Sequence, residues 1–265
     1  MKTLLLGTAA IYAFACAACH SEQTRDRIGN MVADQEAGTE KPPAVVLEEK
    51  NDLIDFTYGW SEEAAAVPEL ATRFDKAMRE WKAELLKGAA EDKAMRAGQG
   101  DEFNGYSGST FWKTAGQSPL LLSLAGETNS YTGGAHGNHG STALLWDRKA
   151  RREIKLVDLF TAIANRDELL ADRWCSALNK QREQKRGEPV GSDGPFNDCP
   201  KLDDISVIPA DKDGDGRFEQ LMLIADPYVA GPWAEGDYEV ELPVTDPLIA
   251  ALKPDYRASF EVQAQ

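Results

Sequence analysis

The chain has 265 residues, of which 42% are hydrophobic and 28% are charged, and its formal net charge is −15. Nucleic acids and anionic lipid surfaces would repel such a chain, so its charge argues against both as partners. The same charge favours a basic partner, unless it serves only to keep the protein soluble. The hydrophobic content is sufficient for a real core.

The first residues have the pattern of a secretory signal. Lys2 precedes an apolar run that is shorter than the about 20 residues needed to span a bilayer. The run ends in Cys-Ala-Ala-Cys, which resembles the lipobox of bacterial lipoproteins. We therefore predict a signal peptide at 1–18 and lipidation of Cys19. The alternatives are lipidation of Cys16 and ordinary cleavage near Ala18, which would leave a free soluble protein.

The expected location is the periplasmic face of a bacterial membrane. No Asp stands at the second mature position after Cys19, which in a Gram-negative host resembles proteins passed on to the outer membrane. The lipid would be the only contact with the membrane. Residues 19–43 are polar and lack apolar periodicity, so they predict a flexible tether. The remainder, 44–265, has the length of one large domain or of two subdomains divided near 157–165.

Two further cysteines, Cys175 and Cys199, lie outside the signal region. In an oxidising compartment an isolated pair is most simply a disulfide. The loop between them contains 23 residues. Closing a loop of that length stabilises a fold by roughly 3 kcal/mol, so we expect a structural bond within the domain.

Hydrophobic periodicity predicts interspersed strands and helices after the tether. An apolar stripe at three- and four-residue steps predicts a helix over 68–86, and a second long helix is expected over 166–186. Strands are expected at 53–58, 109–114, 120–131, 140–146, 151–156, 205–209, 218–225 and 238–243, with short helices at 157–164 and 246–252. Because no regular βαβ order is present, the predicted fold class is α+β with a mostly antiparallel sheet.

A glycine-rich segment between two predicted strands contains Tyr131, His136 and His139. Its four glycines at 131–140 indicate a backbone with unusual torsions or close approach. The two imidazoles are candidate zinc ligands, but a catalytic zinc usually has three protein ligands, so a carboxylate such as Glu235 would have to complete the set. The alternative is a glycine-rich hairpin whose histidines satisfy backbone groups.

An acidic segment with the sequence DKDGDG at 211–216 matches the first half of an EF-hand calcium loop, in which carboxylates alternate and a glycine makes the sharp turn. Met222 stands where an EF-hand has its bidentate Glu, and the flanks have strand character, so a full EF-hand is excluded. The alternative is an acidic turn between two strands. The candidate Ca²⁺ ligands are Asp211, Asp213, Asp215 and Glu219.

A stiff loop at 226–236 carries Tyr228, Trp233 and Glu235 between prolines and glycines. Aromatic side chains on rigid loops bind carbohydrate or protein well, because they lose little entropy on contact. These three residues, together with Tyr131, His136 and His139, are the candidate binding residues, and the sequence leaves open whether the two loops share one face. The alternative is that the two aromatic rings plug the end of the sheet.

Two motifs resemble a known family. The first is Gly-Gly-Ala-His-Gly at 133–137 with the segment IKLVDLF at 154–160, and the second runs from Pro-Tyr at 227–228 to Glu-Gly at 235–236. They resemble the extracellular domain shared by the lysozyme-sensing anti-sigma factor RsiV and the accessory domain of the peptidoglycan deacetylase PdaC. The likeness runs from about 53 to 260. It implies an α+β fold and a binding role in the cell envelope, with lysozyme as the ligand of the best-understood member.

We therefore predict a lipid-anchored, non-catalytic binding module of the cell envelope. Its ligand would be a cationic protein such as a lysozyme, or a peptidoglycan fragment. The competing hypothesis is a metal-dependent periplasmic hydrolase that uses His136 and His139. The sequence contains no G-x-S-x-G elbow, His-Glu-x-x-His motif or phosphate-binding loop, which weakens the enzymatic hypothesis.

Overall fold

The computed structural model describes residues 42–191 and 193–263. The predicted signal peptide, Cys19 and almost all of the tether lie outside the described residues. Lys41–Gln265 is one compact unit. Within the described part, no helix is both long and apolar enough to cross a bilayer.

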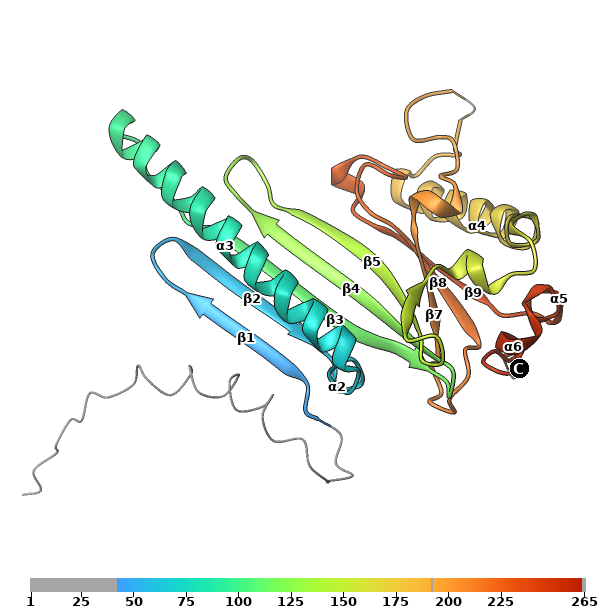
Figure 1. The fold of residues 1–265 in the computed structure, drawn as a ribbon. Coiled ribbons are helices and arrows are strands. Elements are labelled where there is room, and N and C mark those ends of the chain that lie inside the picture. The colour runs from blue at the N-terminus through green and yellow to red at the C-terminus, as the bar shows by residue number, and fades with distance from the viewer. Residues whose placement is uncertain (1–41, 192, 264–265) are drawn as a thin grey trace, which may run out of the picture. The chain divides into compact units, whose positions relative to one another are not determined.

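A six-stranded sheet has its strands in the order β1-β2-β3-β4-β5-β6 (Figure 1). Neighbouring strands are antiparallel except β2 and β3, which run parallel. A parallel pair needs a long crossover connection, which here consists of helices α2 (Glu62–Ala65) and α3 (Pro68–Gln99). The strands are β1 (Val45–Lys50), β2 (Ile54–Trp60), β3 (Tyr106–Gln117), β4 (Leu121–Tyr131), β5 (Asn138–Asp147) and β6 (Arg152–Ile154).

Helix α3 lies along one face of this sheet (Figure 1). Its predicted apolar stripe is buried, with Phe74 and Met78 in the same core cluster as Phe56 of β2. Gly108 of β3 permits a close approach, because a Cβ there would lie 2.8 Å from the ring of Trp81. The apolar side of α3 therefore packs on the sheet, and the predicted helix is present.

The helix continues to Gln99 instead of ending near 86. The added turns carry i,i+4 ion pairs, including one between Asp92 and Arg96 at 2.8 Å, and they bury Ala89 completely. The helix ends where Gly100 adopts a φ of 81°. Such ion pairs support a helix although its composition is charged, which is why the apolar pattern alone placed the end too early.

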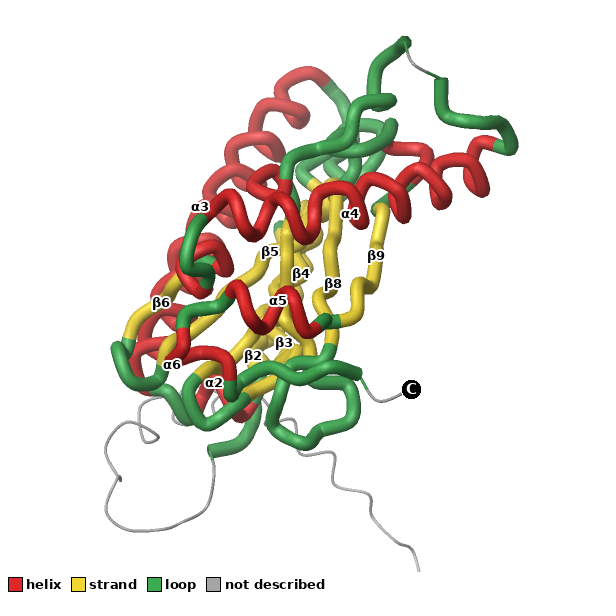
Figure 2. Tube along the Cα trace, turned by 90° about the vertical axis from the view of Figure 1, so that its right-hand side faces the viewer, coloured by secondary structure: helices red, strands yellow, loops and turns green. Residues whose placement is uncertain are grey.

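A second sheet is a three-stranded antiparallel meander of β7 (Ser206–Ala210), β8 (Gln220–Ala225) and β9 (Tyr238–Pro243). Strand β7 contacts β3, β4 and β5, and helix α4 (Ile163–Arg186) packs on β9. Figure 2 shows α4 passing across the strands of this sheet. Trp174 and Leu178 of α4 are buried in its core cluster. The α+β class is thereby confirmed.

Short helices complete the fold. The segment expected as a helix over 157–164 forms only a 3₁₀ helix, η1 (Leu156–Leu159), and α4 begins at Ile163 after three non-helical residues. The closing helix is α5 (Asp246–Ala251), followed by α6 (Pro254–Arg257). Two further 3₁₀ turns are η2 (Leu202–Asp204) and η3 (Trp233–Glu235).

The predicted disulfide is confirmed. Cys175 of α4 is bonded to Cys199, with their Cα atoms 5.5 Å apart. Next to it, Nε1 of Trp174 donates to the carbonyl oxygen of Pro200 at 3.1 Å. The loop at 187–200, called the disulfide loop below, is therefore held to the helix from which it departs.

The strand directions place the three candidate loops at two opposite ends (Figure 1). At one end, called the hairpin end below, β4 leads into the glycine loop (132–137) and β8 leads into the tryptophan loop (226–237). At the other end, β7 leads into the acidic loop (211–219), where the amide of Asp211 donates to the carbonyl oxygen of Ala115 at 3.0 Å. The length of the strands thus separates the acidic loop from the other two.

Candidate functional site

The glycine loop and the tryptophan loop meet at the hairpin end. The indole of Trp233 lies edge-on to two histidines, with ring centroids 4.6 Å from His136 and 5.3 Å from His139. Its Nε1–H donates to Nδ1 of His136. Three residues that we predicted for a binding site are therefore one cluster, although they come from two sheets.

The protonation of His136 decides which contact its Nδ1 makes. An indole nitrogen only donates, so Nδ1 must be unprotonated to accept from Trp233. The same nitrogen lies 2.8 Å from the carbonyl oxygen of Gly137, to which it can bond only when it carries a proton. The two hydrogen bonds therefore exclude each other, and the neutral form of His136 with its proton on Nε2 joins the loops.

His139 and Ser141 of β5 are each held by a carboxylate of the tryptophan loop. Nε2 of His139 lies 2.8 Å from Oδ1 of Asp237, and both side chains are about three-quarters buried. The carboxylate of Asp226 accepts from the amide of Ser141 at 2.9 Å and from its hydroxyl at 2.8 Å. The carbonyl oxygen of Ser141 in turn accepts from Ser206 of β7 at 3.0 Å. Both ends of the tryptophan loop are thus bonded to the six-stranded sheet.

Glu235 supports the loop from inside. Arg186 of α4 donates to both of its carboxylate oxygens, at 2.9 and 3.0 Å, and the hydroxyl of Tyr238 also bonds to it. The ion pair with Arg186 lowers the pKa of Glu235. Burial first, and then the bond to Glu235, raises the pKa of Tyr238 to about 12. This carboxylate is therefore ionised and fully engaged, unlike the open third zinc ligand considered from the sequence.

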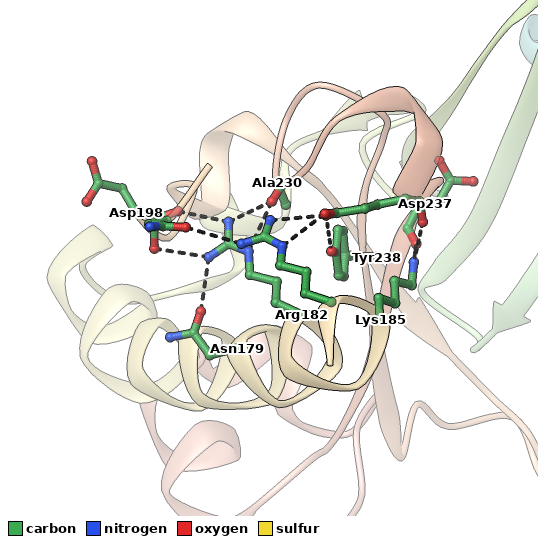
Figure 3. Close-up of polar contacts among 10 residues, drawn as sticks. Asn179, Arg182, Lys185, Asp198, Ala230, Asp237 and Tyr238 are labelled. Carbon is green, nitrogen blue, oxygen red and sulfur yellow. Dashed lines mark hydrogen bonds and ion pairs between the residues drawn. The ribbon is translucent and has the colours of Figure 1, made fainter. Parts of the chain in front are cut away.

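Arg182 of α4 is completely buried and joins the tryptophan loop to the disulfide loop (Figure 3). Its guanidinium donates to the carbonyl oxygen of Ala230 at 2.8 and 3.0 Å. It also donates to the carbonyl oxygens of Asn197 and Asp198, at 3.1 and 3.0 Å, and to Oδ1 of Asn179 at 3.0 Å. One side chain therefore satisfies backbone groups of two loops at once.

The charge of Arg182 is met by these dipoles, since each of these hydrogen-bond partners is a carbonyl or amide oxygen. Burial lowers the pKa of Arg182, and the neighbouring Arg186 lowers it further. A guanidinium nevertheless keeps its proton in proteins. A permanent charge in a buried position is tolerated only when its donors are paired, so the two loops must keep these carbonyl positions.

Tyr228 is presented to solvent in a strained conformation. Its φ is 72°, in the left-handed region that favours glycine, and 57% of the residue is exposed. It occupies the third position of a turn in which the amide of Val229 donates to the carbonyl oxygen of Asp226 at 3.0 Å, after Pro227 at the second. Since a bulky residue is rarely kept in this conformation, the exposed ring is a candidate ligand contact.

Tyr131 stands at the base of the glycine loop. Its hydroxyl donates to the carbonyl oxygen of Gly134 at 3.2 Å. The residue also borders a cavity of about 250 Å³. The other lining residues come from the turn between β1 and β2 and from the start of β3: Lys50, Asn51, Ile54, Asp55, Asn104, Gly105, Tyr106 and Ser107. Tyr131 therefore extends the hairpin end towards a small polar cavity, away from Trp233.

The histidines and Glu235 of the cluster are each bonded to another protein side chain. His136 is bonded to Trp233, His139 to Asp237 and Glu235 to Arg186. Across the described residues, the one group of three possible metal ligands whose atoms lie within 4.8 Å of each other is Asp211, Asp213 and Asp215, at the opposite end of the strands. The candidate ligands His136, His139 and Glu235 thus do not form such a group.

Sequence reasoning missed the residues that hold the cluster together. Arg182 and Arg186 lie in the segment QREQKR, which has the composition of a solvated helix end. Their four-residue spacing places both on one side of the helix, which was the available signal. Asp226 and Asp237 border the predicted loop, but nothing in their spacing indicates Ser141 and His139 as partners.

Comparison with known proteins shows a shared fold. No family model matches the sequence, and no curated protein matches it. A DUF3298 family protein from Pseudomonas aeruginosa PAO1 has a similar solved structure, with a TM-score of 0.52 at 16% identity over 80% of this chain and 95% of that one. A DUF3298 member from Bacteroides fragilis gives a TM-score of 0.45 at 16% identity over 79% and 96%. The structural neighbours are thus DUF3298 proteins.

Replacing Arg182 by Met tests its role as the clamp between loops. Met fills a similar volume but leaves the buried carbonyl oxygen of Ala230 without its donor, and it removes the bonds to Asn197 and Asp198 at the edge of the core. Leaving a buried acceptor unpaired costs about 1–3 kcal/mol, so we expect Arg182→Met to lower the free energy of unfolding in urea by about 2 kcal/mol or more. The control is Arg173→Met on the same helix, which removes a single bond to the carbonyl oxygen of Pro243. Equal losses in the two variants would contradict the clamp.

Two substitutions of Tyr228 separate the strain of the backbone from the role of the ring. Both Tyr228→Ala and Tyr228→Gly lose the ring, but only glycine adopts a positive φ without steric cost. We expect the Gly variant to be more stable than the Ala variant by about 1 kcal/mol in urea denaturation. If the Ala variant is as stable as the Gly variant, the turn does not hold this residue under strain.

Proposed function

We propose that this protein is a non-catalytic binding module of the cell envelope, which uses the hairpin end to recognise a cationic protein of the lysozyme type. The observation that carries the proposal is Tyr228, an exposed aromatic ring kept in an unfavourable backbone conformation beside the cluster of Trp233. Strained backbone conformations are concentrated at functional sites, so the exposed ring of Tyr228 is expected to contact the ligand.

The support for Tyr228 and Trp233 is rigid. Arg182 of α4 holds the tryptophan loop at Ala230, and Asp226 and Asp237 hold its two ends. Lys185 adds a bond from its Nζ to the carbonyl oxygen of Glu235 at 2.7 Å. Aromatic residues on a preorganised surface lose little entropy when a partner binds. They are also the residue types that most often dominate binding energy at protein interfaces.

Charge favours a basic protein over a glycan. The net charge of −15 attracts cationic proteins over several ångströms and speeds their encounter, whereas it gives no such advantage with a neutral saccharide. The motifs at 133–137 and 227–236 resemble the RsiV/PdaC-like domain, whose best-understood member binds lysozyme. Those motifs form the glycine and tryptophan loops, which meet at the hairpin end.

Binding to purified lysozyme at two ionic strengths tests the ligand class. Between about 0.01 M and about 1 M salt the Debye length falls from about 30 to about 3 Å, so a complex steered by charge should weaken steeply. We expect Tyr228→Ala and Trp233→Ala each to weaken it by more than about tenfold, which corresponds to about 1.4 kcal/mol. The matched control is Ile163→Ala, because Ile163 is 62% exposed at the other end of α4.

The same variants are tested against soluble peptidoglycan fragments. Salt-independent binding of fragments without binding of lysozyme would replace the protein ligand by a glycan. If neither probe binds, or if Ile163→Ala weakens binding as much as Tyr228→Ala does, the hairpin end is not the recognition surface and the proposal fails.

The proposed attachment is a lipid on Cys19 with 19–43 as the tether. We expect Cys19→Ala to release the protein from the membrane fraction into the soluble periplasmic fraction, because a short acylated segment is the whole attachment. Fractionation with blotting measures this. The control is Cys16→Ala, which should remain in the membrane fraction. The opposite distribution would assign the lipid to Cys16.

A further inference from the structure

The acidic loop at the far end of the meander takes no part in the proposed binding surface. It connects β7 to β8, and oxygen atoms of Asp211, Asp213 and Asp215 lie within 4.8 Å of one another. Three carboxylates so close repel each other unless a cation lies between them. Exposed acidic turns are common without one, so the cluster by itself does not identify a site.

Glu219 supplies an independent observation. The residue is 3% exposed, and its Oε1 accepts from the amide of Lys212 at 2.7 Å, which directs the carboxylate into the loop. Its Oε2 is buried and has no hydrogen-bond partner. Among the described residues it is the one carboxylate oxygen in that state. A carboxylate oxygen buried without a partner is costly, and a bound cation or its water removes the cost.

The positions follow the numbering of a calcium loop. With Asp211 at position one, Asp213 and Asp215 occupy positions three and five, and Glu219 occupies position nine, which often binds Ca²⁺ through a water molecule. Gly216, at position six, has the positive φ of 92° that the sharp turn requires. The structure thus places the buried Glu219 at ligand position nine, although Met222 stands at position twelve instead of the usual Glu.

Internal bonds of the loop leave room for an ion. The carboxylate of Asp211 accepts from the amides of Gly214 and Gly216, at 2.7 and 3.0 Å. Asp215 accepts from the amide of Arg217 at 2.9 Å, and the Arg217 side chain lies 3.5 Å from its other oxygen. A carboxylate has about four acceptor positions, so each of these groups retains lone pairs for a metal.

The loop is held by three neighbouring segments. Besides the bond from Asp211 to Ala115, a Cβ on Gly116 would lie 2.6 Å from Cβ of Asp211, so β3 approaches the loop more closely than a side chain allows. The amide of Val244 donates to the carbonyl oxygen of Glu219 at 2.8 Å, and the amide of Glu261 donates to that of Phe218 at 3.1 Å. The ligands therefore stand on a fixed frame.

We infer that the acidic loop binds one Ca²⁺ through Asp211, Asp213 and Asp215, with Glu219, which lies outside that group of three, as a further ligand through a water molecule. All donors are hard oxygens, which suit Ca²⁺, while Mg²⁺ demands a tighter octahedron that this open loop does not supply. All four proposed ligands belong to the β7–β8 connection, which is hydrogen-bonded to the end of β3 and to the C-terminal segment.

Calorimetric titration with Ca²⁺ alone, beside thermal melting in chelator or in calcium, tests the site. We expect a single site with a dissociation constant of about 10⁻⁴ to 10⁻³ M, and a melting temperature that rises with calcium. Magnesium should give a smaller shift at equal concentration. Asp213→Ala should weaken calcium binding at least about tenfold, since it removes a ligand from an exposed position where folding does not depend on it.

Glu219→Gln separates a ligand from an ordinary buried acid. Gln replaces the carboxylate that has a buried unpartnered oxygen by a neutral amide, so this variant should melt higher than the wild type in chelator and should gain less from calcium. Asp172→Ala is the matched control, because it removes one exposed acid from α4. The inference fails if calcium gives neither heat nor a shift in the wild type, if Asp172→Ala and Asp213→Ala reduce the response equally, or if magnesium acts as strongly as calcium.

Discussion

The hairpin end depends on one buried charge. Arg182 has no solvent to hydrate it, so the carbonyl oxygens that surround it must stay in place. Those oxygens belong to two separate loops, the tryptophan loop and the disulfide loop. The buried guanidinium thereby fixes the backbone of the two loops by hydrogen bonds, as neighbouring strands fix each other in a sheet. It also explains why a long loop with two prolines and two glycines can present aromatic rings at fixed positions.

The meander of β7, β8 and β9 divides the molecule into two regions of different chemistry. Its turns alternate between the ends of the strands, so the acidic loop and the tryptophan loop are consecutive along the chain but stand apart in space. One end gathers aromatic rings and imidazoles, and the other gathers carboxylates. The strands between them are short and buried, with Leu221 and Leu223 in the core, so each end can change in sequence without affecting the other.

Most helices and strands were predictable because the positions of apolar residues along the sequence indicate which side chains are buried. The apolar runs of β4 and β5, the stripe of α3 and the isolated cysteine pair each reflect a constraint that acts locally along the sequence. Strand β1 was not predicted, since this edge strand has the half-buried pattern of VVLEEK and is defined by its pairing with β2. The contact between His136 and Trp233 was beyond prediction for the same reason: it depends on how two sheets pack, and no periodicity records that.

The place at which the chain enters the domain has a mechanical consequence. Residue Val45 begins β1 and pairs with Trp60, so the chain enters at the end of the strands opposite the glycine and tryptophan loops. A pull between the tether and a ligand held at the hairpin end would act along the strand axes. Hydrogen bonds between antiparallel strands lie perpendicular to that direction, so the load would shear all the pairs from Val45 to Lys50 together instead of opening them one by one. Under the proposed anchoring and binding, this geometry would resist force, whereas a domain entered from the other end would unzip.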